Sequence, residues 1–215
     1  MGTEIRRVAS SEDMLAVRRQ RYATYVGELQ HRDPHANHVD RTIVEPLDDA
    51  GTTLGAFVGT RMVGSVRINY RDFGEYGELP SVRRFEPYLP DGLTLITRLA
   101  IDPPYRCGTL LARFGVELYR YTIANHPETM FGVIACVPAL QGFYRRFGYR
   151  QIGPAFSHSY AGTTVPMAFA MYDREHLRQV GSAVFKLCPR HDAESSNWYV
   201  RTFAAEFESS ACTTT

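Results

Sequence analysis

The sequence predicts one α/β domain over residues 1–215, in which helices flank a central sheet, with a helical extension over about 174–215. The chain has 215 residues, and 44% of them are hydrophobic, so it can bury one sizeable core. Residues 52–70 have the alternating pattern of a strand hairpin. From Thr94 to Tyr149 the order is strand, glycine-containing loop, helix, apolar strand and second helix.

The N-terminal half opens with a helix over residues 14–29. Ser10 and Ser11 precede Glu12 and Asp13, and a serine cap with acidic residues in the first turn stabilises a helix start. Residues 31–49, which contain two prolines, indicate a loop.

Two strands follow, over residues 52–58 and 62–70. Side chains alternate along a strand, so one face of the second strand should carry Val66, Ile68 and Tyr70. The opposite face should carry Ser65, Arg67 and Asn69. Residues 71–92 are rich in glycine and proline and predict a long excursion with a short helix near 81–88.

The C-terminal half supplies the central strands. Residues 93–101 predict one strand, and the continuous apolar run over 130–137 predicts another that is covered on both faces. The helix that begins near Thr109 should bury one stripe, formed by Leu111, Phe114, Leu118 and Tyr121. A second helix begins at Pro138 and ends at Gly148. Residues 149–152 and 165–172 indicate the closing strands.

Composition excludes several classes of protein. The net charge of +1 provides no general attraction for nucleic acid. No run of about 18 apolar residues exists, so we expect no integral membrane segment. The four cysteines are scattered and the start lacks an apolar signal core, which indicates a cytoplasmic protein with free thiols.

Two segments of the C-terminal half suggest chemistry. The run Arg106-Cys107-Gly108-Thr109-Leu110 joins a strand to a helix, and exposed N–H groups at a helix start bind phosphate. The run from Phe143 to Tyr149 reads F-Y-x-x-F-G-Y. A phenol such as that of Tyr144 stays neutral near pH 7 and can still donate a proton.

These segments resemble the donor half of the GCN5-related N-acyltransferase (GNAT) superfamily, whose sheet is mixed and mostly antiparallel. The resemblance implies that Tyr144 protonates the departing thiolate; the alternative is that it only packs beside Phe143. Of the superfamily pattern R-x-x-G-x-G/A, only Arg106 matches in register, and Gly108 is shifted by one. The implied donor-binding residues are Leu99, Ala100, Ile101, Arg106, Cys107, Gly108, Thr109, Leu110 and Phe143.

The N-terminal half resembles one branch of this superfamily, the N-acyl amino acid synthases and acyl-homoserine lactone synthases. The matching pieces are Arg21 with Tyr25, Glu45 with Asp48 and Asp49, Val63 to Arg67, and Thr97-Arg98-Leu99. The resemblance implies a catalytic role for Arg98 beside Tyr144. It also implies that Arg21, Tyr25, Asp48 and Arg67 bind the acceptor or brace the site.

A purely structural ion-pair network is an equally good reading of these charges. Arg67 and Arg98 lie in the middle of predicted strands, and a buried arginine needs a charged partner. Glu45, Asp48 and Asp49 are the expected partners.

Two departures separate the chain from the lactone synthases. Those enzymes carry a glutamate three residues before the arginine of the central strand, where this chain has Leu95, and they favour a tryptophan after the first helix, whereas the one tryptophan here is Trp198. The likeness is therefore closer to the N-acyl amino acid synthases. Candidates for the base that deprotonates the amine are Asp48, Asp102 and His158, or a water molecule.

We expect an N-acyltransferase that moves a medium or long acyl chain from acyl carrier protein or CoA to the amine of an amino acid, small amine or peptide side chain. The amine attacks directly, without a covalent intermediate. We expect no tightly bound cofactor and no metal, because the histidines of the loop, His31, His35 and His38, match no rigid ligand frame. Two alternatives remain: an acetyl-CoA-dependent N-acetyltransferase, and a non-catalytic module that binds an acyl carrier.

Overall fold

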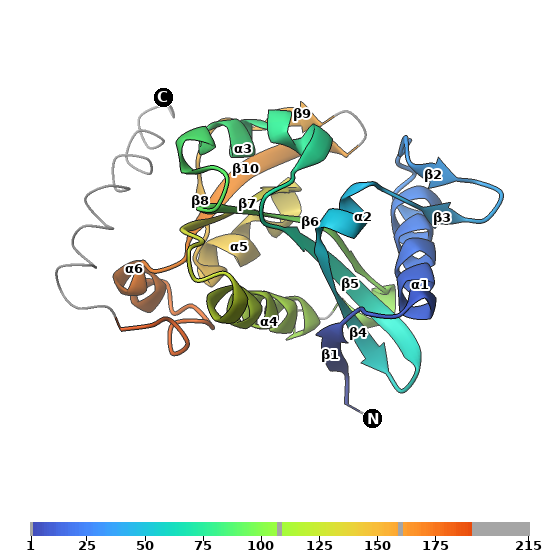
Figure 1. The fold of residues 1–215 in the computed structure, drawn as a ribbon, viewed down its shortest axis with the longest axis horizontal. Helices are drawn as coiled ribbons and strands as arrows, with labels where there is room; N and C mark the ends of the chain where they lie inside the picture. The colour runs from blue at the N-terminus through green and yellow to red at the C-terminus, as the bar shows by residue number, and fades with distance from the viewer. Residues whose placement is uncertain (1, 107–108, 159–160, 191–215) are drawn as a thin grey trace.

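A computed structural model describes residues 2–106, 109–158 and 161–190. The described residues form a mixed sheet of eight strands in the order β1-β4-β5-β6-β7-β10-β8, with β9 paired to β10 (Figure 1). Neighbouring strands are antiparallel except β6 and β7, which are parallel. The strands are β1 (Glu4–Arg7), β4 (Thr52–Val58), β5 (Arg61–Asn69), β6 (Leu93–Ile101), β7 (Phe131–Cys136), β8 (Arg150–Gln151), β9 (Phe156–His158) and β10 (Gly162–Ala170). The predicted fold class, a mostly antiparallel sheet flanked by helices, is confirmed.

Helices cover both faces of this sheet. The helices on one face are α4 (Thr109–Asn125), α5 (Gln141–Phe147) and α6 (Arg174–Gln179). The other face carries α1 (Ser11–Arg21), its π-helical continuation (Tyr22–Glu28), α2 (Leu47–Ala50) and α3 (Pro80–Arg83). Short 3-10 turns lie at Gly74–Glu78, Glu86–Tyr88, Pro103–Tyr105 and Pro138–Leu140, and a small separate pair is formed by β2 (Ala36–Asn37) and β3 (Thr42–Ile43). None of the described helices is long and apolar enough to cross a membrane.

Most predicted elements are present, with local differences. The first helix does begin at its serine cap, since the Ser10 hydroxyl accepts the Asp13 N–H at 3.0 Å. It changes to a π-helix at Tyr22. On α4 the buried stripe contains Leu110 and Tyr119, whereas the predicted Leu111 and Tyr121 are half-buried.

Four strands were missed. Two of them, β2 and β3, have two residues each and lie, with the short helix α2, inside residues 31–49, which were predicted to form a loop. β1 reads Glu-Ile-Arg-Arg and is a mostly exposed edge strand. Its charged residues therefore give no alternation of apolar and polar side chains that would predict a strand. β9 has three residues and is visible only through its pairing with β10. Most of the predicted C-terminal extension, with Trp198, lies outside the described residues.

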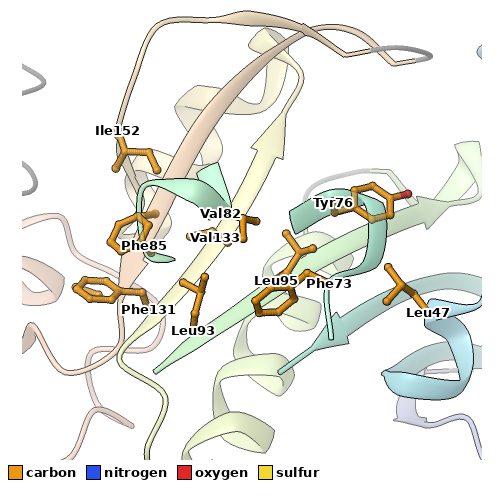
Figure 2. Packing of buried hydrophobic residues seen from close by; sticks show 12 residues of the cluster. Leu47, Phe73, Tyr76, Val82, Phe85, Leu93, Leu95, Phe131, Val133 and Ile152 are labelled. Carbon is orange, nitrogen blue, oxygen red and sulfur yellow. The ribbon is translucent and has the colours of Figure 1, made fainter. Parts of the chain in front are cut away.

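The excursion over residues 71–92 forms a lid of aromatic side chains over β6 and β7. Phe85 packs against Phe131 of β7, with ring centroids 4.6 Å apart, and Phe73 lies beside Leu95 of β6 (Figure 2). Complete burial of side chains of this size stabilises a fold by about 1.5–3 kcal/mol each. The excursion is therefore part of the core, and it holds Tyr76 over the N-terminal half of the sheet.

The sheet opens between its two parallel strands. β6 and β7 pair only where Leu93–Leu95 lie beside Phe131–Val133. From Ile96 onward, the edge of β6 that faces β7 has no strand partner among the described residues. The resulting split lies in the middle of the domain, where a ligand can pair with backbone groups of β6 that have no strand partner among the described residues.

Candidate active site

A buried ion cluster lies at the centre of the sheet beside this split. It consists of three arginines and three carboxylates: Arg21, Arg67, Arg98, Asp33, Glu45 and Asp48, all of them buried. The charges balance within the cluster. Such balance is required, because an unpaired internal charge is very costly.

Glu45 links two of the arginines. Arg98 donates to both Glu45 oxygens, at 2.7 and 2.8 Å, and Arg67 donates to the same carboxylate at 2.8 Å. The Tyr76 hydroxyl, from the excursion, donates to Glu45 at 2.9 Å. Asp33 accepts from Arg98 at 2.5 Å. Glu45 and Asp33 thus fix the Arg98 side chain.

Asp48 connects the first helix to the sheet. It accepts from Arg21 of α1 at 2.6 Å and from Arg67 of β5 at 3.0 Å. These contacts bring together Arg21, Arg67 and Asp48, for which acceptor binding or bracing of the site was predicted. Asp49 was an expected partner, but it is exposed and makes no ion pair with the described arginines; Asp33, which the sequence pattern did not single out, is the third carboxylate.

The backbone of β6 is distorted where Arg98 lies. Thr97 pairs with Arg67 and Ala100 pairs with Ser65, so β6 contains one extra residue and bulges. Arg98 has a φ of 54°, a left-handed conformation that costs about 1–3 kcal/mol for a residue with a side chain. The Tyr25 hydroxyl donates to the Leu99 carbonyl at 2.7 Å and holds the bulge from the π-helix.

The electrostatics of the cluster favour the charged state of Glu45. Burial opposes its ionisation, but hydrogen bonding and attraction from Arg98, with help from Arg67 and Tyr76, lower the pKa of Glu45 from 4.5 to about 2. Attraction to Arg21 and Arg67 likewise outweighs burial and lowers the pKa of Asp48.

Acid is expected to destabilise the protein through Glu45. Because the folded-state pKa is lowered, the contribution to stability is complete above pH 4.5 and disappears as the pH falls toward about 2. The full loss corresponds to about 3 kcal/mol. Urea unfolding at a series of acidic pH values checks this, and a Glu45→Gln variant should show a flatter pH dependence. An unfolding free energy that is constant down to about pH 3 would contradict the assignment.

Two cavities adjoin the split, and a third lies beside the first of them. The cleft cavity, of about 240 Å³, runs between the strands and is lined by Leu95, Thr97, Arg98 and Leu99 of β6, by Ile134, Ala135 and Cys136 of β7, and by Tyr25, His31, Tyr76, Tyr144 and His158. The apolar cavity, of about 50 Å³, lies toward α4 and is lined by side chains that include Ile96, Leu99, Phe114, Gly132, Phe143, Tyr144 and Tyr149. The outer cavity, of about 320 Å³, is lined by Glu75, Tyr76, Leu79, Pro80, Phe156, Ser157 and His158.

Tyr144 lies where the cleft cavity and the apolar cavity meet, together with Ile96 and Leu99. Its hydroxyl has no hydrogen-bond partner within the described part of the chain. Burial, with smaller contributions from Cys136 and Tyr25, raises the pKa of Tyr144. The phenol therefore stays protonated and can donate to a group in the cavity.

Three groups in these cavities were not predicted as site residues, although Tyr149 ends the F-Y-x-x-F-G-Y run. Cys136 follows a plain apolar strand pattern, and His31 lies in a loop whose histidines suggested only a metal site. Tyr149, buried beside Tyr144 with ring centroids 5.3 Å apart, lines the apolar cavity. Only the split between β6 and β7 brings these side chains together.

The predicted phosphate loop is only partly described. Cys107 and Gly108 lie outside the described residues, and Leu110 is buried in the core beside Phe114. Arg106 donates to the Ile101 carbonyl at 2.7 Å and to Glu28 at 2.6 Å. The guanidinium is partly exposed, so a phosphate could replace Glu28 there. Thr109 is exposed at the start of α4.

Two of the three predicted bases do not line the cleft cavity. Asp48 belongs to the ion cluster, and Asp102 binds Gln20 and Arg61 at 3.1 Å each. His158 lines both the cleft cavity and the outer cavity. Among described residues, one group could hold a metal ion, namely His35, Glu45 and Glu75, but both Glu45 oxygens already accept hydrogen bonds from Arg98.

Comparisons with known proteins agree with this architecture. The model of the family described as N-acyl amino acid synthase FeeM matches residues 16–173, whereas no curated protein matches the sequence. The solved structure of FeeM, from uncultured soil microbes, is 16% identical, covers 87% of this chain and 99% of its own, and has a TM-score of 0.66.

Two acyl-homoserine lactone synthases share the fold. BjaI, a CoA-dependent enzyme solved with SAM and isopentyl-CoA, is 18% identical, with a TM-score of 0.62 over 92% of this chain and 100% of its own. LasI is 13% identical, with a TM-score of 0.61 over 79% of this chain and 89% of its own. The resemblance to this branch is therefore confirmed at the level of fold and family model.

Proposed function

Because this chain belongs to the N-acyl amino acid synthase FeeM family and is an N-acyltransferase, we propose that it forms an amide from an acyl thioester and an amine. The donor is a medium or long acyl chain on acyl carrier protein or CoA. The acceptor is the amine of an amino acid, a small amine or a peptide side chain. The observation that carries the proposal is Tyr144, whose phenol has no hydrogen-bond partner among the described residues and lies at the junction of the cleft cavity and the apolar cavity.

The split sheet suits an acyl-phosphopantetheine arm. The arm contains amide groups, and the unpaired edge of β6 from Ile96 offers backbone partners for them. Leu99, Ala100 and Ile101 would then align the donor, and an N–H of the bulge would stabilise the tetrahedral oxyanion. Arg106 and Thr109 would meet the phosphate end, with Arg106 exchanging its Glu28 partner for phosphate.

The reaction needs an acid for the departing thiolate and a base for the amine proton, but no covalent intermediate. The amine nitrogen attacks the thioester carbonyl carbon, the carbon–sulfur bond breaks, and the Tyr144 hydroxyl donates its proton to the departing thiolate. The ion cluster positions the reacting strand, since Arg98 is held by Glu45 and Asp33 within the bulge. In this proposal Arg98 acts by holding the bulge of β6 beside the cleft cavity, which it lines.

Substitution of Cys136 tests whether the acyl group passes directly to the amine, without an acyl-enzyme. Its thiol lines the cleft cavity, but burial raises its pKa to about 11, so little thiolate exists near neutral pH. We expect Cys136→Ala to keep the wild-type kcat and to form no acyl-enzyme, as checked by intact-protein mass spectrometry after mixing with acyl donor. Loss of turnover, or an acyl adduct on wild type that this variant lacks, would contradict direct transfer.

Substitution of Gly132 by alanine tests whether the apolar cavity holds the acyl chain. A Cβ at this position would approach its nearest neighbours, Thr94 and Ile96, no closer than 3.5 Å, so alanine fits without distortion. The added methyl group narrows the cavity. We expect Gly132→Ala to lower kcat/KM for long chains about 10-fold relative to shorter ones. An unchanged chain-length profile with an unchanged melting temperature would place the chain elsewhere.

The proposal is tested with purified protein, a set of amino acids, and acyl chains of increasing length on CoA and on acyl carrier protein. Mass spectrometry should find N-acyl products that depend on Tyr144. A strong preference for acetyl-CoA would favour the ordinary N-acetyltransferase instead. Donor binding without any product, and with Tyr144→Phe indistinguishable from wild type, would favour a non-catalytic carrier-binding module.

A further inference from the structure

We propose that His31 is the general base that takes the proton from the attacking amine, an inference that rests on the proposed function. Amide formation releases one proton from the amine nitrogen, and that proton needs an acceptor inside the cavity. Of the groups considered so far, Asp48 is occupied by the ion cluster. Asp102 lies outside the cleft cavity.

The imidazole of His31 is held in place by its neighbours, but its ring nitrogens make no hydrogen bond within the described part of the chain. Its ring stacks on Tyr25, with centroids 5.8 Å apart and planes at 26°, and its backbone N–H donates to the Tyr25 carbonyl at 2.8 Å. Tyr25 in turn bonds the Leu99 carbonyl, so His31 is tied to the bulge of β6. Its Nδ1 is buried, and within the described part of the chain it has no hydrogen-bond partner. A buried polar atom without a partner is uncommon and calls for an explanation.

The position of His31 distinguishes it from His158. Both line the cleft cavity, but His158 also lines the outer cavity, whereas His31 does not. His158 therefore lies at the junction that an acceptor would cross. His31 lines the cleft cavity together with Tyr144 and Leu99, where the thioester would bind, and Tyr25 connects it to Leu99.

The charges around His31 favour the neutral ring, which is the form that accepts a proton. Burial lowers the pKa of His31, Arg98 lowers it further, and Asp33 opposes them. The other groups that face this region are Tyr25, His158 and Glu75; the pKa of His158 is also lowered by burial and by Arg98. An imidazole that is neutral at pH 7 and can still be protonated is suited to general base catalysis.

The proton balance is complete with His31 and Tyr144. As the amine nitrogen bonds to the carbonyl carbon, its proton passes to an imidazole nitrogen of His31. The carbon–sulfur bond then breaks and the thiolate takes the Tyr144 proton. The imidazolium and the phenolate return to their starting states by proton exchange through solvent, so one thioester and one amine give one amide and one thiol.

Ring-preserving substitution separates this role from packing. His31→Phe keeps a flat ring against Tyr25 and removes both nitrogens, and His31→Ala opens space for added imidazole. We expect each to lower kcat about 100-fold while KM for the acyl donor and the melting temperature stay near wild type. Imidazole should restore part of the activity of His31→Ala and none of that of His31→Phe. His38→Phe, an exposed histidine of the same segment, is the matched control and should keep full activity.

The pH profile supplies a second readout. On the acid side, a plot of log kcat/KM against pH should be steeper by one unit of slope in wild type than in His31→Phe, because one more protonation abolishes activity. Wild-type turnover by His31→Phe, or acid limbs of equal slope in both proteins, would overturn the role of His31 and leave the proposed function intact. If wild type forms no product from any donor, the proposed function fails, and this inference fails with it.

Discussion

Replacing Glu45 by glutamine is expected to lower the free energy of unfolding by about 3–5 kcal/mol, because it breaks a buried ion cluster and leaves one positive charge unbalanced. Glutamine has almost the same shape, so no cavity forms. The glutamine amide has one acceptor oxygen, so it cannot accept the two hydrogen bonds that Arg98 donates to the Glu45 carboxylate. Arg67 keeps Asp48 as its only carboxylate partner among the described residues. The Tyr76 hydroxyl keeps an acceptor only if the amide oxygen faces it.

Urea unfolding followed by circular dichroism measures this change. Glu117→Gln is a matched control, since Glu117 pairs with Arg120 on the exposed side of α4, and exposed pairs contribute about 0–1 kcal/mol. A loss at Glu45 no larger than the loss at Glu117 would show that the cluster does not hold the fold. A large loss would also explain why β6 tolerates the left-handed backbone of Arg98, since the ion pairs on that side chain offset its strain.

Replacing Tyr144 by phenylalanine is expected to lower kcat by about 10²–10⁴-fold, the usual contribution of a positioned acid. The ring contacts with Phe143 and Tyr149 remain, and the hydroxyl has no partner among the described residues, so stability should change little. Binding of the acyl donor should also remain, because the hydroxyl acts on the departing thiolate. Single-turnover kinetics together with donor binding by calorimetry separate these quantities.

Tyr149→Phe is the matched control for Tyr144→Phe. Both phenols lie near Cys136, with Tyr149 buried and Tyr144 half-buried, and burial raises the pKa of each. Tyr149, however, lines the apolar cavity but not the cleft cavity. We expect Tyr149→Phe to keep most of the activity. If the two variants lose activity equally, the acid cannot be assigned to Tyr144 alone; if only Tyr149→Phe loses it, Tyr149 is the acid.

Local patterns were enough to predict most of the fold. Alternation placed Val66 and Ile68 under α4 and Arg67 on the other face, because side-chain direction along a strand depends only on the backbone. Proline and glycine located the excursion and the end of α5 at Gly148, whose φ is 126°. Patterns failed for β1 and β9, whose pairing depends on residues distant in the chain.

For the site, the sequence by itself determined which chemical groups are available: the motif arginines, the acids that follow the first helix, and the phenol of Tyr144. The tertiary structure decided which of them meet. Asp33 rather than Asp49 completes the ion cluster, and His31 and Cys136 reach the cavity of Tyr144. The physical reason is that the parallel pairing of β6 and β7 stops at Leu95 and Val133. That opening depends on the packing of the whole sheet, and no local pattern of residues records it.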